Sequence, residues 1–248
     1  MKVMIGSACV LLASLAQPVL AQDAAETGPP SMFKIEDVDR DNVTAGTPAG
    51  FYAAFKNAEA NQAVRKVDDT DYTFVPLAYI PLPDGKTALV STGGSECTGH
   101  VCSGVNSVHY LEGSISNYKV TGEWLNVGTG GTYGNPATSW GWSDAIASSP
   151  VLYTEGGGTW QGYSCSYASL TELTPKGPVE LVNLPVYYSN AGAIETGATG
   201  MTGRITSAEK DRSFTVTYFG TQKTVNEKYV RGKDGKYKLV GKSKVPTC

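Results

Sequence analysis

Hydrophobic and polar positions divide the chain into an early amphipathic stretch and a long later series of short alternating runs. In the stretch 49–67, apolar residues recur at three- and four-residue spacing from Phe51 to Ala58, as the buried face of a helix requires. Thr47 is a good N-cap residue, and Pro48 suits the first helical turn. The pattern therefore predicts one helix over residues 49–67, packed on the rest of the protein.

After this stretch the chain changes to runs of β-branched and aromatic residues, separated by turn-forming glycine, proline and aspartate. Short runs of this kind predict strands, and hardly any helical periodicity remains beyond residue 67. We therefore expect a mainly β protein: a single antiparallel meander domain arranged as a barrel, a sandwich or a propeller-like stack of small sheets. Separate propeller blades would leave strand edges unpaired, so a closed or sandwiched arrangement is favoured.

Three segments of this meander share a pattern of strand, turn and second strand. They begin at residues 88, 151 and 214, a constant interval of 63 residues, and each continues into a third predicted strand. The central copy contains a triple glycine between two strands predicted over 151–157 and 163–173. Equal spacing is typical of a repeated strand-turn-strand unit, but any meander with regular turns gives a similar pattern, so both interpretations stay open.

The first 21 residues have a basic start, an apolar core and a small-residue end, which is typical of a secretory signal peptide. No later segment approaches the roughly 18 apolar residues that a membrane-spanning helix needs. Residues 22–46 begin with a polar stretch that has no apolar periodicity, so we expect a mobile N-terminal segment. The predicted organisation is a signal peptide over 1–21, this segment over 22–46 and a single β-rich domain over 47–248, in a periplasmic or secreted protein.

Cysteine usage agrees with export. The cysteines beyond residue 21 are Cys97, Cys102, Cys165 and Cys248. An even number in an exported chain indicates disulfide bonds. Close spacing favours a local bridge between Cys97 and Cys102, which leaves Cys165 to pair with Cys248.

Two groups of residues have side chains that suit a metal ion. His100 and His109 lie near the first cysteine pair and could complete a zinc site with it, but a disulfide is expected to prevail in an oxidising compartment. Alternation along the strand predicts that the side chain of His109 is exposed. Asp37, Asp39 and Asp41 alternate like the first ligands of a calcium loop, although the glycine and glutamate that complete a standard loop are missing. We expect no metal or other cofactor.

Four large aromatic residues lie in or near a long glycine-rich connection over 128–142. They are Tyr133, Trp140, Trp142 and Trp160. Such rings could form a flat ligand-binding surface for a sugar ring or another planar molecule. The alternative, which we favour, is that the rings fold back and cover the end of a small β core, because tryptophan is highly buried on average.

Catalytic signatures are sparse. The chain contains no Gly-x-Ser-x-Gly elbow, and its glycines match no phosphate-binding motif. Glycoside hydrolysis needs a pair of carboxylates, and Glu123 with Glu155 in the aromatic-rich half could supply one.

The formal net charge of −3 and the lack of a basic block argue against nucleic acid or an anionic membrane surface as partner. The leading hypothesis is an exported, non-catalytic β-rich binding or structural module of the cell envelope. Its expected partner is an envelope carbohydrate, another planar ligand or an envelope protein. The alternative is a carboxylate-dependent hydrolase that acts on an envelope polysaccharide.

Overall fold

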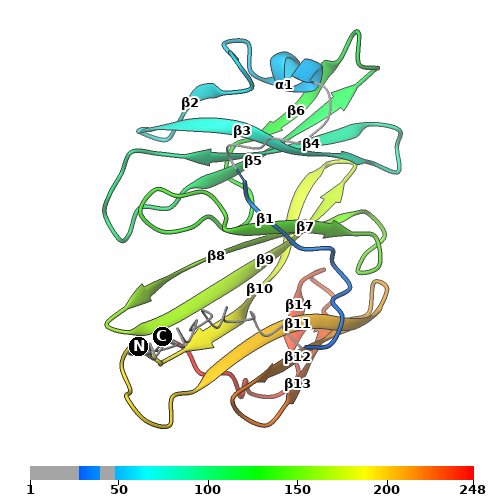
Figure 1. Ribbon diagram of the computed structural model, residues 1–248. Helices are drawn as coiled ribbons and strands as arrows, with labels where there is room; N and C mark the ends of the chain where they lie inside the picture. The colour runs from blue at the N-terminus through cyan, green and yellow to red at the C-terminus, as the bar shows by residue number, and fades with distance from the viewer. Residues whose placement is uncertain (1–27, 40–47) are drawn as a thin grey trace, which may run out of the picture.

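The computed structural model describes residues 28–39 and 48–248, and in this part of the chain it shows many strands and one short helix (Figure 1). The elements in chain order are β1 (Glu36–Asp37), α1 (Pro48–Ala54), β2 (Ala63–Val67), β3 (Thr70–Pro81), β4 (Thr87–Gly94), β5 (Val105–Glu112), β6 (Lys119–Trp124), β7 (Ser139–Ser143), β8 (Val151–Trp160), β9 (Tyr163–Thr174), β10 (Gly177–Ser189), β11 (Gly200–Glu209), β12 (Ser213–Gly220), β13 (Val225–Arg231) and β14 (Tyr237–Leu239). The prediction of a mainly β, antiparallel protein is confirmed.

The strands form two sheets that follow the chain order almost throughout. A five-stranded sheet has the order β2-β3-β4-β5-β6, and a nine-stranded sheet has the order β1-β7-β8-β9-β10-β11-β12-β13-β14. Among the strands that the structure describes, only β1 departs from a simple meander, because it pairs with β7 about a hundred residues further along, with Glu36 opposite Trp140. Tight turns explain the rest: between β8 and β9, Gln161 and Gly162 both have positive φ angles, 50° and 84°, as a type I′ hairpin requires.

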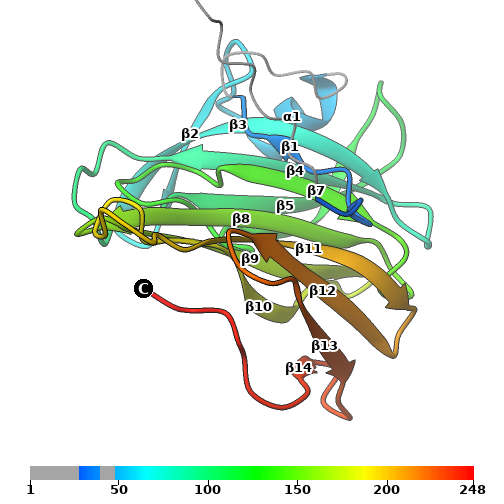
Figure 2. The same cartoon turned by 60° about the horizontal axis from the view of Figure 1, so that its bottom comes forward.

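The molecule is layered, with α1 on the outer face of the five-stranded sheet and the nine-stranded sheet beneath (Figures 1 and 2). Strands β11 to β14 curl under β8 to β10, so this part of the nine-stranded sheet forms a half-barrel. Three apolar clusters hold the layers together: one under α1, one between the sheets and one inside the half-barrel. The arrangement is a two-sheet stack, and the described residues do not form the propeller that was one of the expected alternatives.

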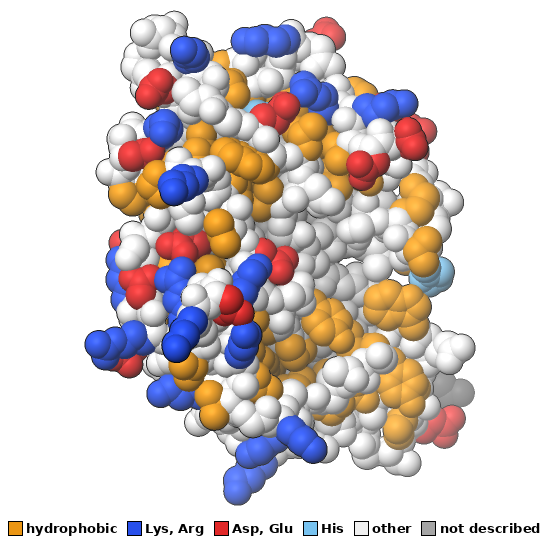
Figure 3. All heavy atoms as spheres, turned by 180° about the vertical axis from the view of Figure 1, so that it is seen from behind, with side chains coloured by type: hydrophobic (Ala, Val, Ile, Leu, Met, Phe, Trp, Pro, Cys, Tyr) orange, Lys and Arg blue, Asp and Glu red, His pale blue; other side chains and the backbone are white. Residues whose placement is uncertain are grey.

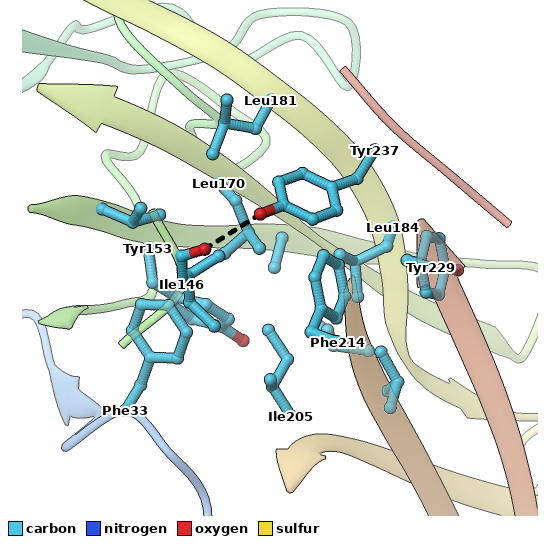
Figure 4. Close-up of a cluster of buried hydrophobic side chains, with 14 of the residues drawn as sticks. Phe33, Ile146, Tyr153, Leu170, Leu181, Leu184, Ile205, Phe214, Tyr229 and Tyr237 are labelled. Carbon is cyan, nitrogen blue, oxygen red and sulfur yellow. Dashed lines mark hydrogen bonds between the residues drawn. The ribbon is translucent and has the colours of Figure 1, made fainter. Parts of the chain in front are cut away.

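The half-barrel encloses the largest of these clusters (Figure 4). The rings of Phe214 and Tyr229 are stacked with centroids 5.0 Å apart, and the hydroxyl of Tyr237 donates to the backbone oxygen of Ile146 at 2.9 Å. Phe33, from the segment before β1, is 3% exposed and packs against Tyr153. The N-terminal segment therefore contributes to the core of the half-barrel.

The glycine-rich connection between β6 and β7 is fixed in the space between the sheets. Asn106 of β5 donates its side-chain amide to the backbone oxygens of Val127 and Thr129, at 3.1 and 3.0 Å. The backbone of the connection also lies directly on β8, because a Cβ atom built on Gly156 would be 1.9 Å from the oxygen of Gly130. Gly156, the first residue of the triple glycine, therefore makes room for this connection, whereas a Cβ atom on Gly157 would meet the backbone of β9.

Two predictions about the N-terminal part need correction. The helix expected over 49–67 ends at Ala54, and its second half forms β2, in which buried and exposed residues alternate. The segment expected to be mobile over 22–46 is ordered where it is described, since residue 32 donates its backbone N–H to residue 205 and β1 pairs with β7. The proposed signal peptide at 1–21 lies outside the described residues.

The strands of the three predicted units are present as β4-β5-β6, β8-β9-β10 and β12-β13-β14. The first unit belongs to the five-stranded sheet, whereas β11 joins the other two into one continuous sheet. The units are therefore not separate modules, and a sequence repeat stays a prediction.

Candidate ligand-binding site

The four predicted aromatic residues do not form one surface. Trp140 and Trp142 lie on β7, opposite Thr154 and Leu152 of β8, whereas Trp160 ends β8 six residues beyond Thr154. A strand rises about 3.3 Å per residue, so these six residues of β8 separate Trp160 from Trp140 by about 20 Å. Trp140 packs against the cluster between the sheets, as the core-covering alternative predicts, while Trp142 and Trp160 are each 39% exposed. On the face in Figure 3, apolar side chains likewise appear in separate patches.

Tyr133 lies with the disulfide loop rather than with the two tryptophans of β7. Its hydroxyl is 2.7 Å from Nε2 of His100, and the two rings are in contact at 4.3 Å. The adjacent Thr132 bonds to the backbone oxygen of Gly157, which fixes this part of the connection near the end of β8. The predicted ring set is therefore divided between the two ends of β8.

The predicted acidic pair is also divided. Glu123 is on the outer face of the five-stranded sheet, where it bonds to His109 at 3.1 Å and to Arg65 at 2.9 Å. Glu155 is on the inner face of the half-barrel, where it accepts a hydrogen bond from Tyr153. Both sheets lie between the two carboxylates, and packed sheets are about 10 Å apart, so the separation exceeds that of a glycosidase pair. Glu123 and Glu155 cannot act together in the arrangement shown.

The cysteines pair as predicted, with bridges from Cys97 to Cys102 and from Cys165 to Cys248. Because the sulfur atoms of Cys97 and Cys102 are bonded to each other, the zinc alternative lacks its thiolates. Residues 28–39 and 48–248 contain no group of three or more His, Cys, Asp or Glu side chains that could hold a metal ion.

The prediction that His109 is exposed is wrong. Its side chain is fully buried beneath α1, where the ring of Phe55 packs on it at 4.9 Å. Burial lowers the pKa of the His109 imidazole, although the hydrogen bond to Glu123 acts in the opposite direction. Helix α1 covers this face of the strand, so alternation alone could not distinguish a solvated face from a covered one.

The predicted calcium ligands do not form a site in the described residues. Asp37 is in β1 and accepts a hydrogen bond from the hydroxyl of Ser139 at 3.2 Å. Asp39 follows two residues later, and Asp41 lies outside the described residues.

A cavity of about 460 Å³ opens at the mouth of the half-barrel. We call it the mouth cavity. Its apolar surface comes mainly from the segment before β1 and from β8 and β10, and its polar groups come from β7, β8 and β11. The residues are Ser31, Phe33, Ile35, Ser139, Tyr153, Glu155, Val186, Tyr187, Thr202, Gly203 and Arg204. Barrel mouths are common ligand sites. Here a buried apolar floor is combined with polar side chains from several strands.

Two charged side chains of opposite sign border the mouth cavity. The buried hydroxyl of Tyr153 donates to Oε2 of Glu155 at 2.6 Å, and burial together with the nearby carboxylate raises the pKa of Tyr153, so it remains a donor. Arg204 donates to the backbone oxygen of Pro29 at 3.1 Å and lies over the ring of Phe219. The cavity therefore presents an oriented carboxylate and a supported guanidinium above an aromatic floor.

The sequence pattern does not reveal most of the mouth cavity. It suggests Glu155 only as half of a catalytic pair, and it does not distinguish Tyr187 or Arg204 as site residues. Their positions depend on the curling of the nine-stranded sheet, which brings β8, β10 and β11 around one space. The alternation of β10 is the only sequence signal that places Tyr187 on one face of its strand.

None of the helices described is long and apolar enough to cross a bilayer. Comparisons with family models, curated proteins and solved structures found no match.

Proposed function

We propose that the protein is an exported, non-catalytic binding module of the cell envelope whose ligand enters the mouth cavity. The observation that carries the proposal is the cavity itself: its volume is about 460 Å³, its floor consists of the buried residues Phe33, Tyr153 and Val186, and polar side chains surround this floor. Export rests on the signal-peptide pattern of residues 1–21, and the two disulfides are compatible with it.

The lining favours a ring-shaped or planar ligand without a large net charge. Tyr187 is 39% exposed at the cavity and can stack on a ring. One carboxylate and one guanidinium offset each other, so a strongly charged ligand of either sign gains little. The hydroxyls of Ser139 and Thr202 add neutral hydrogen-bonding groups. An aromatic heterocycle or a short sugar satisfies these conditions.

The test is a screen of aromatic heterocycles and short oligosaccharides by ligand-observed NMR, followed by calorimetric titration of the hits. We expect Tyr187→Ala to weaken binding about tenfold, since a lost aromatic contact removes about 1 kcal/mol or slightly more. Thr202→Trp should abolish binding by filling the cavity. Tyr163→Ala is the matched control, because Tyr163 is 36% exposed and lies outside the cavity.

Two results would reject the proposal. One is the absence of any hit at concentrations up to about 1 mM, a threshold that corresponds to only about 4 kcal/mol of binding free energy. The other is a set of hits whose affinity is the same in Tyr187→Ala, Thr202→Trp and the control.

A further inference from the structure

A second cavity lies at the seam where the two sheets meet. We call it the seam pocket; its volume is about 390 Å³. It is lined from β6 and the following connection on one side, and from β9 and β10 on the other. Its main residues are Trp124, Asn126, Val127, Thr171, Pro178 and Glu180. It shares no residue with the mouth cavity.

The walls of the seam pocket are held in place by contacts between the sheets. The β9–β10 hairpin rises to the five-stranded sheet (Figure 1), and the hydroxyl of Tyr110 donates to the backbone oxygen of Thr174 at 2.8 Å. Trp124 packs edge-on against Tyr110, with ring centroids 4.8 Å apart. A Cβ atom on Gly122 or Gly177 would be 2.4 or 2.6 Å from the indole, so both glycines make room for it. The pocket is thus a preformed feature of the fold.

Four polar groups at the seam pocket have no hydrogen-bond partner among the described residues. They are the indole N–H of Trp124, the side-chain amide of Asn126, the hydroxyl of Thr171 and the carboxylate of Glu180. Other buried groups nearby are partly paired: Asn106 bonds to three partners and Tyr110 bonds to Thr174, whereas the hydroxyl of Ser169 has no partner. Asn126 and Glu180 are exposed to solvent, so of the four groups only the Thr171 hydroxyl is both buried and unpaired.

Thr171 is the most informative of the four. The residue is only 2% exposed, and its Oγ1 atom is buried without a partner. A buried hydroxyl in this state is less stable than one that is hydrogen-bonded. It lies on the same face of β9 as Leu173, which belongs to the cluster between the sheets, so it is directed toward the seam. Its Oγ1 atom has almost no accessible surface, so a ligand hydroxyl in the pocket would satisfy it after a small displacement of the pocket wall.

We infer that the seam pocket binds a pyranose ring of a neutral glycan. The indole of Trp124 and the ring of Pro178 provide an apolar surface for the C–H face of a sugar. Thr171, Asn126 and Glu180 supply donors and acceptors for its hydroxyl groups. The carboxylate of Glu180 would repel an acidic sugar. This site goes beyond the mouth cavity, and the two can be tested separately.

The probes are short neutral oligosaccharides of glucose and of N-acetylglucosamine, with an oligogalacturonate as the acidic comparison. Calorimetric titration of the full chain should show binding of at least one neutral probe at or below about 1 mM. Titration should change the tryptophan fluorescence, and Trp124→Phe should remove that change.

Thr171→Val keeps the shape of the side chain and removes the hydroxyl, so it should weaken binding about tenfold while raising stability. Ser169→Ala is the matched control: Ser169 lies on the same face of β9 and its hydroxyl is also buried without a partner, but it does not line the pocket. This variant should bind like the parent protein. Asn126→Ala and Glu180→Gln alter exposed side chains and should weaken binding without affecting folding.

Failure of every neutral probe to bind overturns the inference. So does binding that is equal in Thr171→Val, Asn126→Ala, Glu180→Gln and the parent protein, because the sugar would then lie elsewhere. Equal affinity for the oligogalacturonate would overturn the assignment to neutral glycans. Tyr187→Ala at the mouth cavity should leave oligosaccharide binding at the seam unchanged.

Discussion

Gly156 occupies a position in β8 where the fold leaves no room for a methyl group. The Cβ atom of an alanine there would lie 1.9 Å from the backbone oxygen of Gly130, whereas real Cβ atoms essentially never approach closer than 3.0 Å. Neither backbone can yield easily. Gly156 is paired with Tyr167 of β9 and directly follows the residues of β8 that pair with β7, and the connection is held by a hydrogen bond of 2.9 Å from the N–H of Thr129 to Oγ1 of Thr154.

The cost of Gly156→Ala can be estimated from these contacts. Overpacking in a rigid site costs about 1–3 kcal/mol, and displacing one hydrogen bond of the connection costs about 1 kcal/mol more. The reduced freedom of the unfolded chain returns about 0.4–1 kcal/mol. We therefore expect a net loss of about 1–3.5 kcal/mol in the free energy of unfolding, or roughly 2–14 °C in melting temperature for a domain of this size.

Chemical denaturation followed by circular dichroism measures this loss, with both disulfides intact. Gly158→Ala is the matched control, since its Cβ would meet the ring edge of Trp160 at 2.9 Å and the Thr132 side chain at 3.1 Å. Side-chain ends can move, so this variant should lose less than about 1 kcal/mol. If both variants lose the same amount, or Gly156→Ala loses almost nothing, the close approach of the two backbones is not what requires glycine.

Two further predictions concern covalent and ionisable groups. Replacing Cys165 and Cys248 with serine opens a loop with a sequence separation of 83, which in the chain-entropy model should cost about 4.5 kcal/mol of the free energy of unfolding. Replacing Cys97 and Cys102, with a separation of 5, should cost about 2 kcal/mol. Equal losses of the two pairs in urea titrations would contradict this prediction. Burial lowers the pKa of His109 in the folded state, so the unfolded chain takes up a proton on this histidine first as the pH falls. The stability that neutral His109 contributes should therefore be fully present above about pH 6.5, the pKa of a free histidine, and should decline below it. Denaturation between pH 8 and 5 should show a smaller decline in His109→Gln, and parallel curves would exclude this histidine as the cause.

The strands were predictable because turn chemistry marks their ends. Asp84-Gly85 and Asp234-Gly235 each precede a strand closely, and both glycines have positive φ angles, 83° and 78°. The pairing of the cysteines was also predictable, since spacing alone favoured the local bridge. These features depend on neighbours in the chain, and local sequence contains the relevant information.

The predicted helix is longer than the observed one for a physical reason. Phe51, Ala54 and Phe55 pack on the five-stranded sheet as predicted, but Ala60 and Asn61 adopt positive φ angles of 47° and 63° in a tight turn. Ala63 then becomes the buried end of a strand that pairs with β3. Its apolar side chain fits both periodicities, and tertiary pairing decided between them.

The binding sites depend on contacts that the sequence does not display. Trp124 and Thr171 are 47 positions apart and belong to different sheets, so only the packing of β6 beside β10 brings them to one pocket. Likewise, Glu123 and Glu155 are closer in sequence but are directed away from each other. Candidate residues could be found by type, but their grouping required the fold.

The short strands at the ends of the nine-stranded sheet affect how the protein behaves at high concentration. In the part of the chain that the structure describes, the outermost strands of this sheet are short: β1 contributes two residues and β14 three. A second chain that tried to extend the sheet would gain few hydrogen bonds. Long, flat borders invite such growth into aggregates, and short ones discourage it. The two outermost strands described in the nine-stranded sheet therefore offer little backbone for a second chain to pair with.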